Sequence, residues 1–329
     1  MSVTEMEVVR SPFSHPAPQV LTRYFISTAL AAVTLALPAT RLGADAATAT
    51  GVRYDRLAVM GGAATVAHVI GFRYFDRAWY QGQRRDSIRW LNDWSGETYV
   101  HVDKMGHFMG GLFLSNSLSS AYRWTGFGDR SSTLLGTITS WAVLFEIEMR
   151  DAYFDQWGFS LHDFTANTTG AAVPLVHTLF PSTRIVGFKF SWWPSSLYLN
   201  YEERRDAGRP HTRYAIDDYE GMNFWLTLAL NELLPGSAEL RWPDWLGVAL
   251  GFGARGMHGS NVKSRGQNRE YSNLPSAKPE LLLSFDFDPR FLPGDSLCWR
   301  ELKSQLNWLR YPAPAVRLYP DFRFYFLYL

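Results

Sequence analysis

The segment Phe188-Lys189-Phe190-Ser191-Trp192 alternates apolar and polar residues, which is typical of a β-strand with two unlike faces. Before Pro181 the apolar residues follow helical spacing instead. Three helices are predicted there, at about residues 101–123, 131–153 and 160–180. The change at Pro181 therefore predicts an α+β protein, in which an N-terminal helical bundle is followed by a strand-rich, aromatic antiparallel sheet.

The alternation of period two returns in Asn223–Asn231 and Leu283–Asp288. Leu246–Arg255 has the regularly placed glycines of a twisted or closed sheet, and Phe322–Leu329 is aromatic throughout, so both are also expected to be strands. The five or six such segments in the chain are fewer than the roughly eight strands of the smallest membrane barrels. We therefore expect a partial sheet that packs on the helices or rests on a membrane surface. The polar stretches 202–213 and 257–279 are expected to be loops.

The N-terminus has the order of a secretory signal. Basic residues precede an apolar run, Tyr24–Leu37, and small residues follow it. The run is about 14 residues long, whereas a helix that crosses a bilayer needs about 20. We expect residues 1–47 to be an export signal, with an uncleaved anchor as the alternative. The helical domain is then expected at 48–181 and the strand-rich, membrane-associated region at 182–329.

The composition argues against one class of partner and favours another. Lys plus Arg number 32 and Asp plus Glu 31, so a net charge of +1 provides no attraction for nucleic acid. Aromatic residues make up 16% of the chain and include 13 tryptophans, which is typical of membrane interfaces or, alternatively, of a large aromatic core. Leu57–Phe75 is expected to form a helix with a small-residue face. Membrane lipid is the expected partner, and the sequence identifies no protein partner.

The predicted helices carry polar residues at spacings that place them on shared faces. Asp103 and His107 are four residues apart, and so are Asp163 and Asn167. In the helix between them, Glu146 follows directly on an apolar run, where a carboxylate needs a partner. If the helices pack as a bundle, these faces converge. The candidate site residues are Asp103, Lys104, His107, Glu146, Asp151, Asp163 and Asn167.

Three interpretations of these residues stay open. The first is a divalent metal site, because imidazole and carboxylates together commonly bind Zn, Mn or Fe. Its ligands would be Asp103, His107, Glu146 and Asp163. In the second, His107 is a general base and Lys104 stabilises an oxyanion. The third is a buried ion-pair network in which Lys104 pairs with Glu146 or Asp151, and Asp163 caps the third helix together with Ser160, its predicted N-cap. The spacing matches no specific ligand motif, so the sequence leaves the cofactor unidentified.

Three motifs follow one another in this part of the chain. They are D-K-x-x-H-F at Asp103–Phe108, an acidic helix at Glu146–Asp151, and G-x-S-x-x-D-x-x-x-N-x-x-G at Gly158–Gly170. Their order and spacing resemble the uncharacterised bacterial family of predicted periplasmic lipoproteins typified by YfiM, over roughly residues 75–180. A fainter similarity runs to VanZ-like membrane proteins. Neither family implies an established reaction. The chain differs from the lipoprotein pattern in its strand-rich half and in lacking an acylated cysteine, since its only cysteine is Cys298.

The sequence thus predicts an uncharacterised protein of the bacterial cell envelope, in the periplasm or outer membrane, with inner-membrane anchoring as an alternative. Its expected role is structural or binding rather than catalytic. A metal- or histidine-dependent hydrolase that acts on envelope lipid or cell-wall material is the alternative, motivated by the histidine and carboxylates. An outer-membrane pore is a third hypothesis.

Overall fold

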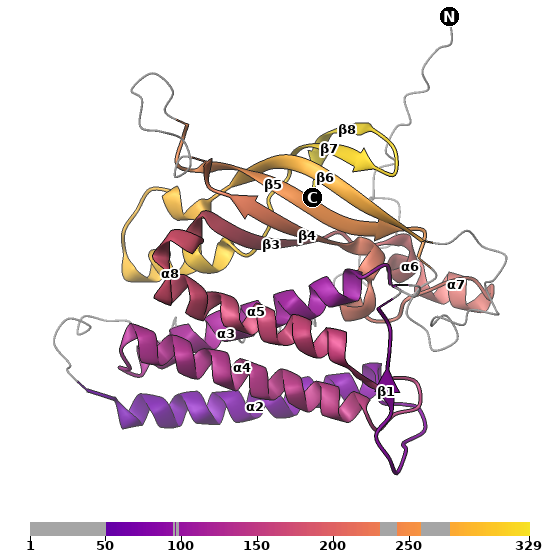
Figure 1. Ribbon diagram of the computed structural model, residues 1–329, viewed down its shortest axis with the longest axis horizontal. Coiled ribbons are helices and arrows are strands. Elements are labelled where there is room, and N and C mark those ends of the chain that lie inside the picture. Colours follow the sequence, from indigo (N-terminus) through magenta and orange to yellow (C-terminus); the bar gives the residue numbers. More distant parts are fainter. Residues whose placement is uncertain (1–50, 95, 97–98, 231–241, 258–276) are drawn as a thin grey trace, which may run out of the picture.

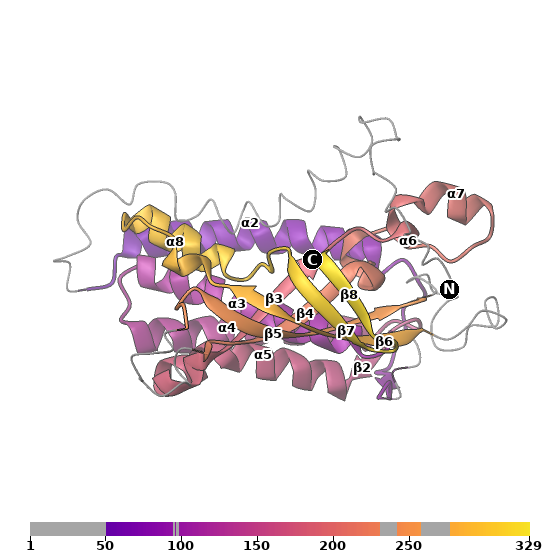
Figure 2. The same cartoon turned by 90° about the horizontal axis from the view of Figure 1, so that it is seen from above.

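The computed structural model describes residues 51–94, 96, 99–230, 242–257 and 277–329. The signal-like segment at 1–47 and most of the expected loop at 257–279 lie outside these described residues. Within them the chain has the predicted α+β organisation, with long helices in the N-terminal half and an antiparallel sheet of six strands in the C-terminal half. Figures 1 and 2 show the helices and the sheet as stacked layers.

Four long helices form the helical layer. They are α2 (Tyr54–Ala78), α3 (Val102–Trp124), α4 (Asp129–Asp151) and α5 (Leu161–Leu179). The helix predicted at Leu57–Phe75 and the three predicted after it are confirmed. Figure 1 shows α3 and α5 nearest the sheet and α2 farthest from it. In the described part of the chain, α2 is the one helix long and apolar enough to cross a membrane, and its apolar stretch is 11% buried.

Small residues allow α3, α4 and α5 to approach closely. A Cβ atom on Gly111 of α3 would lie 2.5 Å from the carbonyl oxygen of Asn167 on α5. A Cβ atom on Gly136 of α4 would lie 2.3 Å from Oγ of Ser119 on α3. The Ser140 hydroxyl donates a hydrogen bond of 3.0 Å to the carbonyl oxygen of Gly111. These contacts fix the relative positions of the three helices, because a larger residue would separate them.

The sheet consists of six antiparallel strands in chain order. They are β3 (Val186–Trp192), β4 (Met222–Leu228), β5 (Leu246–Arg255), β6 (Lys278–Phe287), β7 (Ala313–Tyr319) and β8 (Arg323–Tyr328). In the described residues β8 does not pair with β3, so the sheet is partial, as predicted. Of the six strands, β7 has no counterpart in the sequence prediction.

Three shorter helices accompany the sheet. They are α6 (Ser196–Leu199), α7 (Tyr201–Asp206) and α8 (Leu297–Leu306). The prediction of a loop at 202–213 is wrong in its first part, which α7 occupies. Tyr201 is buried, and Arg205 forms an ion pair of 2.9 Å with Glu202 one turn away. The polar composition of this stretch therefore reflects the solvated face of a short helix.

A short parallel strand pair connects the segment before α3 to the start of α5. It is formed by β1 (Trp90–Leu91) and β2 (Phe159–Ser160), with Leu91 opposite Ser160. Turns of 3-10 helix complete the described elements: η2 (Pro181–Ile185), η3 (Ala215–Asp217), η4 (Tyr219–Gly221) and η8 (Pro289–Phe291). The β1–β2 pair matters for function because it places the chain just after β1 beside the first turn of α5.

A hydrophobic core joins the helices to the sheet. Val102 of α3 is fully buried and Phe224 of β4 is 3% exposed, and both belong to this core. The ring of Phe108 on α3 meets the ring of Phe188 on β3 edge to face, with centroids 4.8 Å apart. Because burial of apolar surface is the main driving force of folding, this core holds the start of α3 against β3 and β4.

Candidate functional site

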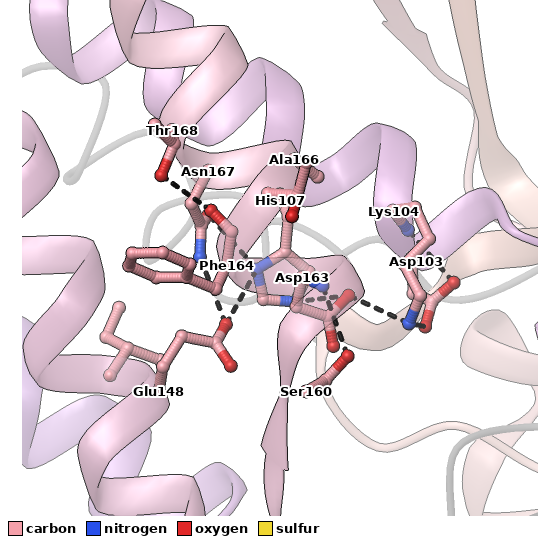
Figure 3. Close-up of polar contacts among 12 residues, drawn as sticks. Asp103, Lys104, His107, Glu148, Ser160, Asp163, Phe164, Ala166, Asn167 and Thr168 are labelled. Atoms are coloured by element: carbon pink, nitrogen blue, oxygen red, sulfur yellow. Dashed lines mark hydrogen bonds and ion pairs between the residues drawn. The ribbon is translucent and has the colours of Figure 1, made fainter. Parts of the chain in front are cut away.

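Three helix ends meet at one end of the helical layer (Figure 3), where α3 and α5 begin and α4 ends. Asp103 lies in the first turn of α3 and Asp163 in the first turn of α5. Ser160 caps α5 as predicted, because its Oγ accepts a hydrogen bond of 3.1 Å from the backbone N–H of Asp163. The unpaired N–H groups and dipole of a first helical turn favour carboxylates, so both acids are stabilised at this end.

The ammonium group of Lys104 lies among three carboxylates. Its Nζ is 2.8 Å from Oδ2 of Asp103 and 2.8 Å from Oδ1 of Asp163, and it donates a hydrogen bond to Asp93. Asp93 in turn accepts a hydrogen bond of 2.9 Å from the Ser160 hydroxyl. The prediction that Lys104 pairs with an acid of α4 is therefore wrong, because its partners come from α3, α5 and the segment after β1.

The imidazole of His107 lies between two other carboxylates. Its Nδ1 is 3.5 Å from Oε1 of Glu148 on α4, and its Nε2 is 3.8 Å from Oδ1 of Asp163. Asn167 bridges the pair, since its Oδ1 lies 3.2 Å from Nδ1 of His107 and its Nδ2 donates a hydrogen bond of 3.0 Å to Glu148. The polar faces of α3 and α5 therefore converge, as the spacing predicts. The polar cluster consists of Asp93, Asp103, Lys104, His107, Glu148, Asp163 and Asn167.

Burial and ion pairing act in opposite directions on Lys104 and Asp103. Burial alone lowers the pKa of Lys104, but the charges of Asp103 and Asp163 outweigh it and hold that pKa above its ordinary value. Burial raises the pKa of Asp103, and the charge of Lys104 opposes the rise. The lysine is therefore held in its charged form by the acids around it.

His107 and Glu148 are both shifted toward their protonated forms. Burial alone lowers the pKa of His107, but the negative charges of Asp163 and Glu148 outweigh it and raise the pKa to about 9. Burial raises the pKa of Glu148 to about 8, against the attraction of the imidazole. At neutral pH the site therefore favours the protonated forms of both His107 and Glu148.

Glu146, a predicted site residue, lies outside the polar cluster. Its Oε2 is 3.4 Å from Nε2 of His68 on α2, and its Oε1 is 3.0 Å from Nη2 of Arg150. At about 100° per residue, positions 146 and 148 differ by about 200° around a helix. Their carboxylates therefore point to opposite sides of α4, and Glu148, which is 1% exposed, takes the place predicted for Glu146.

Asp151, another predicted site residue, lies one turn after Glu148 at the margin of the polar cluster. Burial and the charge of Asp151 raise the pKa of Tyr80 on the neighbouring segment. The charge of Asp151 also adds to the effect of burial in raising the pKa of Glu148. Asp151 therefore acts on the cluster through its charge, and the ion pairs of Lys104 do not include it.

Sequence reasoning missed Asp93 and His162, whose Nδ1 lies 3.3 Å from Oδ1 of Asp93. Asp93 reaches the polar cluster because the pairing of β1 with β2 brings it beside Ser160. That pairing joins segments about 70 residues apart, and local periodicity carries no information on contacts at that range. No pattern in the sequence therefore points to Asp93.

A signal for Glu148 does exist in the sequence. The buried residues of α4 include Thr133, Gly136 and Ser140, which recur every three or four positions. Small residues at this spacing mark the helix face that packs against a neighbour. The same face continues to Ile147 and Glu148 near the end of α4. The face of small residues thus identifies Glu148, whereas the apolar run before Glu146 does not.

Donor atoms for a cation are present in two overlapping groups. His107, Glu148 and Asp163 each offer one donor, and these atoms lie within 4.8 Å of one another. Asp93, Asp103 and Asp163 form a second such group, but the ammonium of Lys104 already contacts all three. The first group is therefore the better candidate, and a histidine with two carboxylates suits Mn, Fe or Zn.

The polar cluster keeps some access to solvent. The side chains of Asp93 and His107 are each 23% exposed, and that of His162 is 30% exposed. Glu148 and Asn167 lie deeper, at 1% and 2% exposure. An ion could thus approach past His107 and reach the deeper carboxylate.

Comparison with known protein families gives a match to part of the chain. Residues 90–178 match the model of a family described as predicted periplasmic lipoprotein (DUF2279). The segment that matches this lipoprotein family runs from β1 to the end of α5 and contains the whole polar cluster. The predicted location in the bacterial cell envelope agrees with the family's description, and a lipoprotein is a membrane-associated protein. The sheet lies outside the matched residues. No curated protein and no solved structure matches the chain significantly.

Proposed function

We propose that this chain is a binding protein of the cell envelope, rather than a catalyst, and that its polar cluster binds a divalent cation. The ligands would be His107, Glu148 and Asp163. The observation that carries the proposal is the convergence of three donor atoms from three different helices within 4.8 Å of one another. Sites formed by side chains on facing helices are a common way to bind metal in helical bundles.

The balance of charge supports a cation. Four carboxylates, those of Asp93, Asp103, Glu148 and Asp163, lie around two basic groups, those of Lys104 and His107. Because His107 must be neutral to bind a metal, the polar cluster with its other groups ionised has a net charge of −3, which a divalent cation reduces to −1. Without a cation, protons must compensate, and this agrees with the raised pKa of Glu148. Buried charge that is not paired is costly.

The second candidate function is the metal- or histidine-dependent hydrolase. The position of His107 between Glu148 and Asp163 favours it, because a carboxylate can orient an imidazole that accepts a proton. The hydroxyl of Ser160, at the edge of this cluster, is fully buried and already bonded to Asp93 and to the backbone of α5. A nucleophilic serine is therefore not supported, and only an activated water remains for this alternative. The YfiM and VanZ resemblances fit an envelope location but imply no reaction.

Titration of the purified, chelator-treated full chain with ZnCl2 and with MnCl2, followed by calorimetry, tests the proposal. We expect one ion to bind per chain. The variant Glu148→Gln should lose affinity by at least about tenfold. The matched control Glu146→Gln, the same change on the other side of α4, should bind like the unmodified chain.

Absence of stoichiometric binding in the unmodified chain would contradict the proposal, and so would an equal loss in both variants. If no ion binds but Glu148→Gln is less stable than Glu146→Gln, the polar cluster is a structural network. Hydrolysis of phospholipid or peptidoglycan that depends on both the ion and His107 would favour the enzyme.

A further inference from the structure

The sheet has an apolar face that runs without interruption across all six strands. One row of residues in register contains Phe188, Leu226, Leu250, Leu283, Val316 and Phe324. The neighbouring row contains Phe190, Phe224, Phe252 and Leu281. Residues opposite one another in antiparallel strands point to the same side of a sheet. Both rows therefore belong to one continuous apolar surface.

Part of this surface is covered and part is not. Over β3, Phe108 of α3 packs on Phe188. Farther along the same row, Leu250, Leu283 and Phe324 are 46%, 46% and 62% exposed. The exposed sheet face consists of Leu250, Leu281, Leu283, Phe285, Phe324 and Phe326. Figure 1 shows β7 and β8 farther from the helices than β3.

The opposite side of the same strands is buried and combines polar residues with a small hydrophobic cluster around Trp225 and Leu282. Its buried polar residues are Lys189, Ser191, Asn223, Thr227, Glu280, Ser284, Asp286 and Arg317. Nζ of Lys189 lies 2.9 Å from Oδ2 of Asp286, and Nη1 of Arg317 lies 2.6 Å from Oε1 of Glu280. In β6 the two sides alternate, since Glu280, Leu282, Ser284 and Asp286 are buried while Leu281, Leu283 and Phe285 are exposed.

This distribution is the reverse of that in an antiparallel sheet which faces water, where the polar side is outward. Strands with an apolar outer side and a polar inner side are typical of proteins in contact with lipid. In water, burial of these charges and exposure of the leucines would both be unfavourable. Against hydrocarbon, the exposed leucines and phenylalanines would be in a favourable environment, while the charges on the other side stay paired inside the protein.

We propose that the exposed sheet face rests against the hydrocarbon of a lipid bilayer. Exposed basic residues lie toward the strand ends at Arg255, Lys278 and Arg323, on the polar side of the sheet, where Arg255 forms an ion pair of 2.6 Å with Glu280. Arg255 and Lys278 are direct neighbours across β5 and β6. Exposed basic residues at the ends of the strands complement the anionic headgroups of bacterial phospholipids.

The sheet is seated on the membrane and does not cross it. In the described part of the chain, no strand pairs with the outer edge of β8. Unpaired backbone groups are too costly for the hydrocarbon interior, so this edge must stay at the polar interface. The inference is independent of the cation site, which lies in α3, α4 and α5.

Fluorophores at chosen positions test this contact. Cys298, the only cysteine of the chain, is first replaced in Cys298→Ser. Leu283→Cys and Phe324→Cys then receive an environment-sensitive label, and Leu199→Cys on α6 is the control because Leu199 is exposed to a similar degree, 48%. Vesicles of phosphatidylethanolamine and phosphatidylglycerol should shift the emission to shorter wavelength at positions 283 and 324 and leave position 199 unchanged.

Charged substitutions give a second measurement. The double variant Leu283→Lys with Phe324→Lys should bind the same vesicles at least about tenfold more weakly than Leu199→Lys does. Circular dichroism checks that both variants are folded, which is expected because the changed side chains are exposed. Glu148→Gln should bind vesicles like the unmodified chain. Loss of cation binding therefore does not affect the test of membrane contact.

Two outcomes would overturn the inference. The first is an unchanged emission at positions 283 and 324 when vesicles bind. The second is a shift that occurs without vesicles and follows dimer formation in gel filtration, which would show that a second copy of the chain covers the face.

Discussion

A Cβ atom on Gly170 of α5 would lie 1.9 Å from the carbonyl oxygen of Phe108 on α3. The backbones of the two helices are therefore in contact next to His107 and Asn167. This contact holds Nδ1 of His107 3.2 Å from Oδ1 of Asn167. The geometry of the polar cluster thus depends on glycine at position 170.

Gly170→Ala should lower the free energy of unfolding by about 1–3 kcal/mol, because the added methyl group forces α3 and α5 apart. Gly110→Ala is the matched control, since a Cβ atom there meets nothing within 4 Å. It should stabilise the chain by about 0.5–1 kcal/mol through helix propensity. Urea unfolding measures both changes. Equal stability of the two variants would show that the helices can separate at no cost.

The metal-free protein should lose stability between pH 4.5 and about 9. The pKa of His107 is raised from 6.5 to about 9, so its contribution is complete below pH 6.5 and is lost as the pH rises through 9. The pKa of Glu148 is raised from 4.5 to about 8, so the unfolded chain ionises more readily and stability falls over that range too. Each proton contributes a slope of up to about 1.4 kcal/mol per pH unit.

Urea unfolding at fixed pH, with chelator present, measures this dependence. In His107→Gln the free energy of unfolding should fall less steeply above pH 6.5 than in the unmodified chain. In Glu148→Gln it should fall less steeply below pH 8. A stability that increases across the same range would mean that neither group holds its proton more tightly in the folded state.

Lys104→Met should destabilise the chain by about 3–5 kcal/mol, because Asp103, Asp163 and Asp93 then lose their shared cation. The loss should diminish in acid, where the carboxylates are protonated. Arg123→Met is the control, since it removes an exposed ion pair with Asp129 and should cost at most about 1 kcal/mol. If both variants unfold at the same urea concentration, Lys104 does not hold these acids together.

Lys189→Met should also destabilise the chain by about 3–5 kcal/mol, because Asp286 is buried and Lys189 is 2.9 Å from it. The double variant Lys189→Met with Asp286→Leu removes both charges and should recover most of the loss. Thermal unfolding in a mild detergent compares the three chains. Additive losses would show that the two side chains do not interact.

The helices could be predicted with some accuracy because their periodicity is a local property. The stretch predicted at 131–153 corresponds to α4 at Asp129–Asp151, and Leu246–Arg255 was predicted with the bounds that β5 has. The stretch at 202–213 was misjudged, because buried Tyr201 and the pairing of Arg205 with Glu202 stabilise a short helix that composition does not indicate. The strand β7 was missed as well.

The sequence predicted that the polar faces of α3 and α5 meet, but it identified the wrong acid of α4. Spacing of four residues correctly placed Asp103 with His107 and Asp163 with Asn167 on faces that meet. It could not choose between the two acids of α4, because that choice depends on how α4 is rotated against its neighbours. The contacts of Gly136 and Ser140 with α3 set this rotation and turn Glu148 inward.

The sequence by itself determined the α+β class, the four long helices and the face pairings within α3 and α5, since each follows from the regular repeat of one element. Only the tertiary structure decided that Asp93 and Glu148 complete the polar cluster, and that the apolar side of the sheet is exposed while its charged side is buried. These features depend on contacts between segments far apart in the chain. The repeat of a single helix or strand fixes which residues share a side, but not which side faces the interior.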